Sequence, residues 1–227
     1  MKALIKHNII YILLYLLLLG IIGYVLLNAG KVPIHREMNT YVGNTFIDQF
    51  LAYATHLGDG LFAVLIAIAF SFQNVRVSLY ILFSYAGAGI MSYILKHWVY
   101  YEVTRPHFVF QYYVREQLKL VDGVDVVAFH SFPSGHALSA FALFFCLLFV
   151  SKNHFSKMVF FLLAILAAYS RVHLSQHWLI DVYVGSIIGV CFSILLYVVF
   201  YSTNKWPHLN TNLSTLISIT HKNLSDT

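Results

Sequence analysis

Apolar residues dominate the chain in long runs that short polar stretches separate. A helix needs roughly 17–25 residues to cross the hydrocarbon core of a bilayer, which is about 30 Å thick. Six apolar runs reach or approach that length, at residues 8–28, 57–74, 77–96, 133–150, 158–174 and 178–201. The pattern therefore predicts an all-α integral membrane protein with about six transmembrane helices.

The composition agrees with this prediction. The 227-residue chain is 59% hydrophobic and only 10% charged, whereas soluble domains carry roughly 25% charged residues. The first run follows Lys2 and Lys6 as a secretory signal would, but it continues without a small-residue cleavage site, so we interpret it as a retained anchor. Cys146 and Cys191 lie within predicted spans, where a thiol behaves as a small hydrophobe. They indicate neither a disulfide nor a metal framework.

No long linker, repeat or low-complexity block interrupts the sequence. We therefore treat residues 1–227 as one membrane-embedded domain with a polar tail at 202–227. Residues 38–55 place aromatic side chains among polar ones at near-helical spacing, which favours a helix in the membrane interface over an ordinary loop. Small residues recur in the third span and in the last, where they let helix backbones approach closely.

Loop charges predict the orientation, because Lys and Arg in short loops are retained on the cytoplasmic side. With both termini inside, the inner cations are Lys2, Lys6, Arg76, Lys152, Lys157, Lys205 and Lys222. The outer cations are then Lys31, Arg36, Lys96, Arg105, Arg115, Lys119 and Arg171. Lys96, Arg105 and Arg171 have a chemical reason to lie outside, which leaves seven inner cations against four outer ones. We therefore expect both termini in the cytoplasm.

Ionisable residues are costly in a membrane, so the places where they gather indicate function. On the predicted topology they gather at one side, in three groups: Lys96 with Arg105-Pro106, Pro133-Ser134-Gly135-His136, and Ser170-Arg171 followed by His177 and Asp181. For any single cation, snorkelling to the interface is the ordinary explanation. Three cations, two histidines, a carboxylate and a helix start on one face together indicate an anion site.

The Pro-Ser-Gly-His group is typical of a helix start, in which Ser131 can cap and Pro133 suits the first turn. The backbone N–H groups of Ser134, Gly135 and His136 are then exposed at the positive end of the helix dipole, which favours a phosphate. Gly135 also lets an oxygen approach the main chain closely. The tetrapeptide alone is a weak signal, because a plain helix cap has the same pattern.

His177 and Asp181 are four residues apart and therefore lie one turn apart on one helix face. A carboxylate there can hold one ring nitrogen and fix the tautomer, which leaves the other nitrogen as nucleophile or base. Such a pair is also a common structural contact. Arg171 can reach the same outer mouth through a short turn, and its guanidinium suits forked contacts with phosphate oxygens, whereas Lys96 acts as a point charge.

Together the three groups resemble the type 2 phosphatidic acid phosphatase family, which includes membrane lipid phosphatases and soluble vanadium haloperoxidases. The family pattern is Lys before Arg-Pro, then Pro-Ser-Gly-His, then Ser-Arg, five residues, His, three residues and Asp. It matches residue by residue over about 90 residues. One departure is the gap between Lys96 and Arg105, which holds the eight residues 97–104 instead of six. Two extra residues rotate a helix by about 200°, so a loop must absorb the insertion.

The resemblance implies a phosphoryl transfer in two steps. His177, oriented by Asp181, would attack phosphorus, and His136 would protonate the leaving group before water hydrolyses the phosphohistidine. The residues that would bind the phosphate are Lys96, Arg105, Ser134, Gly135 and Arg171. Because protein cations supply the positive charge, we expect neither a metal nor a cofactor.

The resemblance allows several substrates: phosphatidic acid, phosphatidylglycerol phosphate, the lipid A phosphates or undecaprenyl diphosphate. We expect a lipid phosphate in the bacterial inner membrane, with the site facing the periplasm or the cell exterior, and we expect no nucleic-acid partner. The loop 107–132 is expected to cover the site and to select among these lipids. The sequence does not indicate the oligomeric state.

Two alternatives remain open. Within the family, a haloperoxidase would hold vanadate in the same cradle, but those relatives are soluble. From another class, a polytopic lipid or ion transporter could use the polar cluster as a binding site, although transporters place their sites near the bilayer midplane at broken helices.

Overall fold

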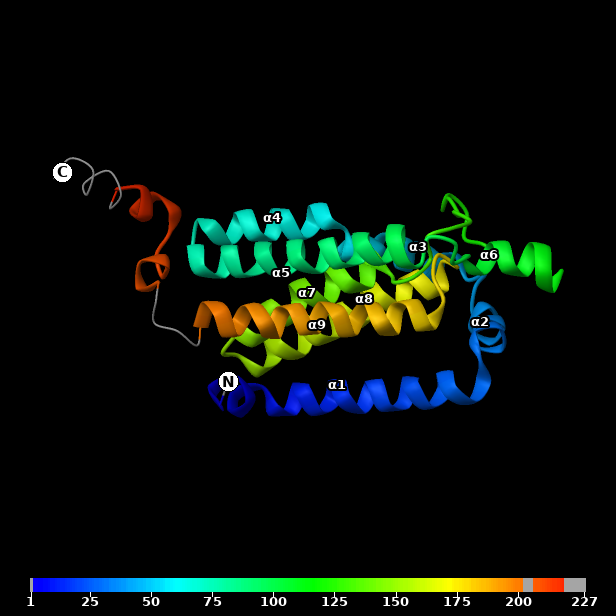
Figure 1. Ribbon diagram of the computed structural model, residues 1–227, viewed down its shortest axis with the longest axis horizontal. Helices are drawn as coiled ribbons and strands as arrows, with labels where there is room; N and C mark the ends of the chain where they lie inside the picture. Colours follow the sequence, from blue (N-terminus) through cyan, green and yellow to red (C-terminus); the bar gives the residue numbers. More distant parts are fainter. Residues whose placement is uncertain (1, 202–205, 219–227) are drawn as a thin grey trace.

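The computed structural model describes residues 2–201 and 206–218, and within them the secondary structure is helical with no β-strand. Four helices are long and apolar enough to cross a membrane: α1 (Lys2–Ala29), α5 (Val75–Ile94), α8 (His154–His173) and α9 (Leu179–Tyr201). They run along one common long axis with two shorter helices, α4 (Gly60–Ser71) and α7 (Gly135–Val150) (Figure 1). The predicted all-α membrane fold is thus confirmed.

The prediction of about six spans is not reproduced when helices are counted by length and apolar composition. The described residues contain four candidate spans, or five if Thr45–Gly58 and Gly60–Ser71, which are bent by 58° relative to each other, form one. The predicted span 57–74 began too early, because a 3₁₀ turn, Thr55–Gly58, precedes α4. Helix α7 has only 16 residues, about 24 Å at 1.5 Å per residue.

Helix α7 forms the centre of the bundle. Residues 137–149 are all buried, and the helix packs against α5, α8 and α9. Two glycines of α9 permit the closest approach: a Cβ on Gly185 would lie 2.7 Å from Ser134 O, and one on Gly189 would lie 2.5 Å from Leu138 O. The small residues of the last span therefore let α9 pack directly against the Pro-Ser-Gly-His helix, as expected from the sequence.

Helix α1 lies at the edge of the bundle, beside α9 and α8 (Figure 1). Polar contacts hold it there: the hydroxyls of Tyr15 and Ser186 are 3.0 Å apart, and Tyr11 OH donates to His154 O at 2.7 Å. Most of its outward side chains are apolar and exposed, such as Leu17 at 60%. These side chains would face lipid in a membrane.

Two short helices follow α1 at one end of the bundle, α2 (Lys31–Asn39) and α3 (Thr45–Ala54) (Figure 1). The predicted interfacial segment is helical over α3 rather than over all of 38–55. Its aromatic side chains are exposed, Phe46 at 81% and Tyr53 at 75%, which suits a helix lying in the membrane interface.

The same end of the bundle carries a projection. It is formed by α6 (Pro106–Val109) and the π-helical turn Phe110–Val114, and it extends beyond the other helices (Figure 1). The start of α1 and the end of α9 lie at the opposite end (Figure 1), as the topology with both termini on one side requires.

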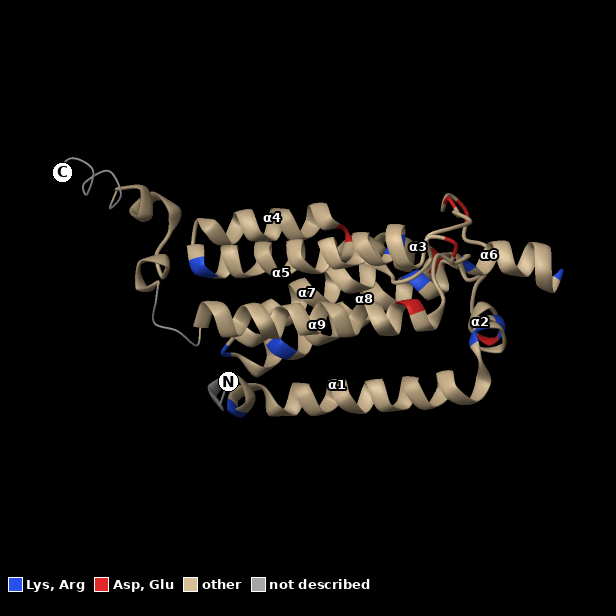
Figure 2. Cartoon of the chain, in the orientation of Figure 1, with Lys and Arg blue, Asp and Glu red and all other residues tan. Residues whose placement is uncertain are grey.

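Charges are distributed unevenly between the two ends (Figure 2). Lys and Arg occur at both, whereas the Asp and Glu residues of the described ranges gather at the end with α2, α3 and α6. Of the predicted polar tail, residues 202–205 and 219–227 lie outside the described ranges. Residues 206–218 contact the start of α5, where Arg76 donates to Trp206 O and Val75 N donates to Thr211 O at 2.8 Å.

Candidate active site

Helix α7 begins at Gly135, and its N-cap is Ser134, whose Oγ accepts from Ala137 N at 3.4 Å. The prediction that Ser131 caps this helix was wrong. Ser131 lies further upstream, and its Oγ donates to Asp181 Oδ2 instead. The Ser131 hydroxyl therefore binds the buried carboxylate of Asp181 on α9. The cap is Ser134, which belongs to the Pro-Ser-Gly-His group itself.

The backbone amides at this helix end differ by one residue from the expected cradle. The amide of Ser134 donates to Asp181 O at 3.0 Å and is not free for a ligand. The amides of Gly135 and His136 have no hydrogen-bond partner within the described residues. A Cβ on Gly135 would meet only Ser92 Oγ, at 3.8 Å. The open N–H groups of the helix end therefore belong to Gly135 and His136.

A tight turn between α8 and α9 places Arg171 beside His177. The amides of Gln176 and His177 both donate to Arg171 O, at 3.0 and 3.1 Å. On the other side of the turn, Asp181 Oδ2 accepts from the backbone N–H of Trp178 at 3.0 Å. One turn thus connects the guanidinium of Arg171, the imidazole of His177 and the carboxylate of Asp181. The number of residues between them in the sequence is the length that this turn needs.

The imidazole of His177 lies next to Asp181, but not on one helix face as predicted, because His177 is in the turn before α9, which begins at Leu179. Nδ1 lies 3.5 Å from Asp181 Oδ2, and the two side chains are 2% and 1% exposed. This distance exceeds that of an ordinary hydrogen bond. Burial lowers the pKa of His177 well below its ordinary value, and the charges of Arg105, Arg171 and Lys96 lower it further. Burial and these charges thus favour the neutral form of the ring, the form in which Nε2 can act as a nucleophile.

The cations around His177 are held by neutral groups. Arg105 Nε donates to Phe129 O at 3.0 Å, and Nη1 donates to Gln176 Oε1 at 2.8 Å. Lys96 Nζ donates to His130 O at 2.9 Å. Burial lowers the pKa of Arg105, and the nearby carboxylate of Asp181 acts in the opposite direction.

The guanidinium of Arg171 has a buried N–H donor with no hydrogen-bond acceptor among the described residues. The residue is 8% exposed, Nη1 donates to Thr55 Oγ1 at 2.6 Å, and the buried Nε has no hydrogen-bond partner within the described ranges. Buried donors are nearly always paired. None of the ion pairs among the described residues involves Lys96, Arg105 or Arg171. The arrangement is that of a site for an anion.

The insertion between Lys96 and Arg105 is absorbed where α5 ends. Helix α5 stops at Ile94, a π-helical turn covers Leu95–Val99, and residues 100–104 form a loop. A π-helical turn holds more residues than an α-helical one. Lys96 consequently stays close enough to interact electrostatically with Arg105 and Arg171.

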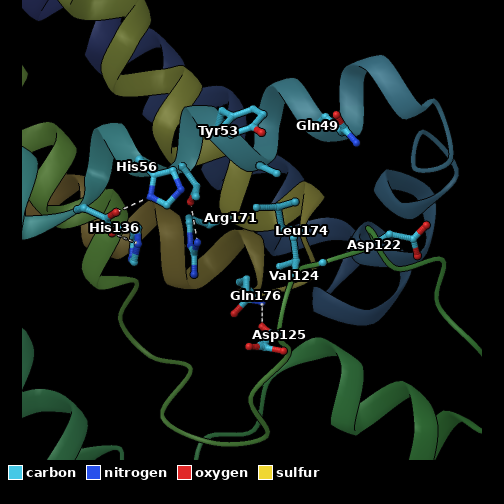
Figure 3. A pocket seen from close by; sticks show the side chains of 14 residues that line it. Gln49, Tyr53, His56, Asp122, Val124, Asp125, His136, Arg171, Leu174 and Gln176 are labelled. Atoms are coloured by element: carbon cyan, nitrogen blue, oxygen red, sulfur yellow. Dashed lines mark hydrogen bonds and ion pairs between the residues drawn. The ribbon is translucent and has the colours of Figure 1, made fainter.

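A cavity of about 460 Å³ opens beside this cluster. His136 lines it from α7, Arg171 from the end of α8 and Gln176 from the α8–α9 turn (Figure 3). His56 and Asp59 line it from the segment before α4. His177 does not line the cavity. The cavity therefore reaches the phosphate-binding candidate Arg171 and the acid candidate His136, while the nucleophile candidate His177 is buried away from it.

Asp59 is the most informative residue that the sequence analysis missed. Its Oδ1 lies 2.7 Å from His136 Nε2, and its Oδ2 lies 2.6 Å from His56 Nδ1 (Figure 3). A Cβ on Gly58 would lie 2.7 Å from His136 O, so this glycine lets the 3₁₀ turn approach α7. The available signal was a carboxylate inside the predicted span 57–74, since an ionisable residue in a span is a functional candidate by default.

Only part of the loop 107–132, which was expected to cover the site, lines the cavity. Residues 122–125 line the cavity, and Gln176 Nε2 donates to Asp125 O at 2.6 Å. The aromatic residues Tyr112 and Tyr113 are 60% and 73% exposed on the projection and do not line the cavity. Among residues 2–201 and 206–218, no group of three or more His, Cys, Asp or Glu side chains is placed to hold a metal ion.

This geometry defines a helical membrane protein with an enclosed anion site. The sequence model of the PAP2 superfamily matches residues 77–205, more than half of the chain. The chain therefore belongs to the PAP2 superfamily, and the resemblance noted from its motifs is confirmed. No curated protein matches the sequence significantly.

Two solved structures share the fold. Aquifex aeolicus LpxE aligns with a TM-score of 0.63 and 22% identity, over 73% of this chain and 93% of that one. A transmembrane PAP2 type phosphatidylglycerolphosphate phosphatase from Bacillus subtilis aligns with a TM-score of 0.62 and 21% identity, over 88% of this chain and 98% of that one.

Proposed function

We propose that this protein is a membrane lipid phosphatase that hydrolyses a phosphate monoester or diphosphate of an envelope lipid. One observation carries the proposal: the buried imidazole of His177 lies among the three cations Lys96, Arg105 and Arg171, none of which has a carboxylate partner within the described residues. Membership of the PAP2 superfamily supports it. One neighbour in fold is named as a phosphatidylglycerolphosphate phosphatase.

In the first step, Nε2 of His177 forms a bond with phosphorus while the ester P–O bond breaks. Asp181, next to Nδ1, stabilises the positive charge that develops on the ring. The three cations and the amides of Gly135 and His136 bind the equatorial oxygens, whose charge is greatest in the transition state. These donors are fixed before the substrate arrives, so little reorganisation is needed.

His136 serves both steps as the proton carrier. It gives a proton to the departing alkoxide or phosphate, and in the second step it takes one from the water that attacks phosphorus as the P–N bond breaks. Asp59 orients its ring through the 2.7 Å contact with Nε2 and stabilises its protonated form. His56 contacts the other oxygen of Asp59, and all three residues line the cavity.

The cations supply the positive charge that a metal would otherwise provide, so we infer that the reaction is metal-independent. A transporter is less favoured, because the candidate site residues lie at the end of the bundle where the described Asp and Glu residues gather (Figure 2), and transporters bind near the midplane at broken helices. A haloperoxidase would use the same cradle, but the four long apolar helices place this chain in a membrane.

We further infer an inner-membrane protein whose site faces the periplasm or the cell exterior, from the distribution of Lys and Arg among the loops. Tyr113→Cys at the site end and Phe155→Cys at the other end, in a chain without Cys146 and Cys191, test this orientation. An impermeant thiol reagent should label position 113 in intact cells and position 155 only after lysis. The reverse pattern would contradict it.

The reaction itself is tested by phosphate release in detergent. The substrates are phosphatidic acid, phosphatidylglycerol phosphate, a lipid A phosphate and undecaprenyl diphosphate, each with and without EDTA. We expect release from at least one lipid, no effect of EDTA, and no release by the His177→Ala variant. Release from none of them would overturn the proposal, and loss with EDTA would overturn metal independence.

A further inference from the structure

A second cavity lies at the end of the bundle away from the candidate active site. Its volume is about 450 Å³, and it is formed where α1 and α8 begin and where α7 and α9 end. Its polar wall includes His7, Lys152, His154 and Lys157, and its apolar wall includes Phe149 and Tyr197. The proposed reaction uses none of these residues.

Lys157 is the unusual member of this group. It is 2% exposed, and Nζ donates to the backbone O of His7 at 2.9 Å and to Asn8 Oδ1. Both acceptors are neutral, and an ammonium has three N–H donors. A buried charge is costly unless it is paired. Two hydrogen bonds to neutral groups leave this charge uncompensated and one donor available.

The protein offers no carboxylate to Lys157. Within residues 2–201 and 206–218, Asp and Glu belong to segments at the opposite end (Figure 2), and Lys157 takes part in no ion pair there. The cavity also adjoins the start of the 20-residue helix α8, whose dipole adds positive potential. The side-chain charges at this cavity and the start of α8 therefore favour an anion, whereas the ends of α7 and α9 act in the opposite direction.

We propose that this cavity binds the phosphate-bearing headgroup of an anionic lipid from the leaflet opposite the candidate active site. The phosphate accepts the remaining N–H of Lys157 and interacts with Lys152 and His154 at the rim. Phe149 and Tyr197 contact the glycerol and the first methylenes of the acyl chains. Because the cavity lies at a bundle end, it is at the depth where headgroups lie. The ordinary alternative is that Lys157 only joins α1 to α8.

Thermal unfolding of the full-length protein in detergent tests the inference with three probes: phosphatidylglycerol, phosphatidylcholine and inorganic phosphate. Phosphatidylglycerol is a diester without a terminal phosphate, so turnover does not complicate the measurement. We expect phosphatidylglycerol to raise the melting temperature, and phosphatidylcholine and inorganic phosphate to have little effect. The stabilisation should persist in the His177→Ala variant, which separates this site from the proposed reaction.

The decisive variant changes the rim and leaves the Lys157 contacts with α1 in place. Lys152→Gln combined with His154→Gln should weaken phosphatidylglycerol binding by at least about fivefold, the effect of one cation near a headgroup. Arg115→Gln, at the opposite end, is the matched control and should leave binding unchanged. Equal stabilisation by phosphatidylcholine, or unchanged binding by the rim variant, would overturn the proposal. Displacement of phosphatidylglycerol by millimolar inorganic phosphate would overturn the lipid as the source of the anion.

Discussion

The candidate site contains two His–Asp pairs that are built differently. His177 and Asp181 come from one turn of the chain, and their side chains are 2% and 1% exposed. His136 and Asp59 come from separate helical segments, and their side chains are 32% and 37% exposed at the rim of a cavity. The first pair is sealed among cations, and the second is in contact with solvent. The difference suits two roles, a nucleophile that must stay unprotonated and an acid that must exchange protons with water.

Loss of the nucleophile should have the largest effect. His177→Ala should abolish the hydrolysis of alkyl and aryl phosphates alike, because no other side chain can form the covalent intermediate. Phosphate release per mole of protein measures this, with size-exclusion elution as the check on folding. Retention of more than a few per cent of the activity would remove His177 from its role.

Asp181→Asn should reduce the rate by about 10⁴-fold, as replacement of the carboxylate does in a serine-protease triad. The amide cannot stabilise the developing imidazolium charge. The loss should be similar for phosphatidic acid and for p-nitrophenyl phosphate, since both form the same intermediate. Measuring kcat for both substrates tests this, and a loss confined to the lipid would contradict the assignment.

His136→Ala should distinguish the leaving groups. Loss of a general acid typically costs 10²–10⁴-fold for a poor leaving group, so hydrolysis of phosphatidic acid should fall in that range. The p-nitrophenolate leaving group departs without a proton, so its release in the first turnover should be impaired much less. The two substrates are compared on the first turnover, because the second step needs His136 for both. Arg171→Ala is the contrast and should affect both substrates comparably. Equal losses on both substrates for His136→Ala would make this residue a phosphate-binding group instead.

Asp59→Asn should have the smallest effect, about tenfold on an alkyl phosphate, which is less than the 10²–10⁴-fold typical of the general acid itself, because the histidine remains in place. The carboxylate favours protonated His136, so its loss should move the alkaline limb of the pH–rate profile to lower pH. Asp122→Asn lines the same cavity without contacting a histidine and should leave the profile in place. A rate loss without a shift of that limb would indicate a structural role only.

The same comparison shows what the sequence could predict. Helical periodicity predicted the proximity of His177 and Asp181, although His177 lies in the turn before α9. The short spacing to His177 predicted the position of Arg171. The Asp59–His136 contact depends on how a 3₁₀ turn packs against α7 at Gly58, and no local pattern contains that information. Likewise, helix-start rules could not decide between Ser131 and Ser134 as the cap, because the choice depends on the buried carboxylate of Asp181.

Helix lengths were harder to predict than helix positions. All six apolar runs became helices of the bundle, but hydropathy alone could not show that the run at 133–150 yields a central helix packed among other helices. Nor could it show that Asp59 separates the 3₁₀ turn from α4.

The central claim is that His177 carries the phosphoryl group while His136 handles the protons. Rapid acid-free quenching during turnover of p-nitrophenyl phosphate, followed by peptide mass spectrometry, tests it directly. Phosphate should be found on His177 in the wild-type protein. It should accumulate in the His136→Ala variant, because the second step then lacks its base, and it should be absent from His177→Ala. Phosphate on His136, or turnover with no phosphohistidine on residue 177, would contradict the account.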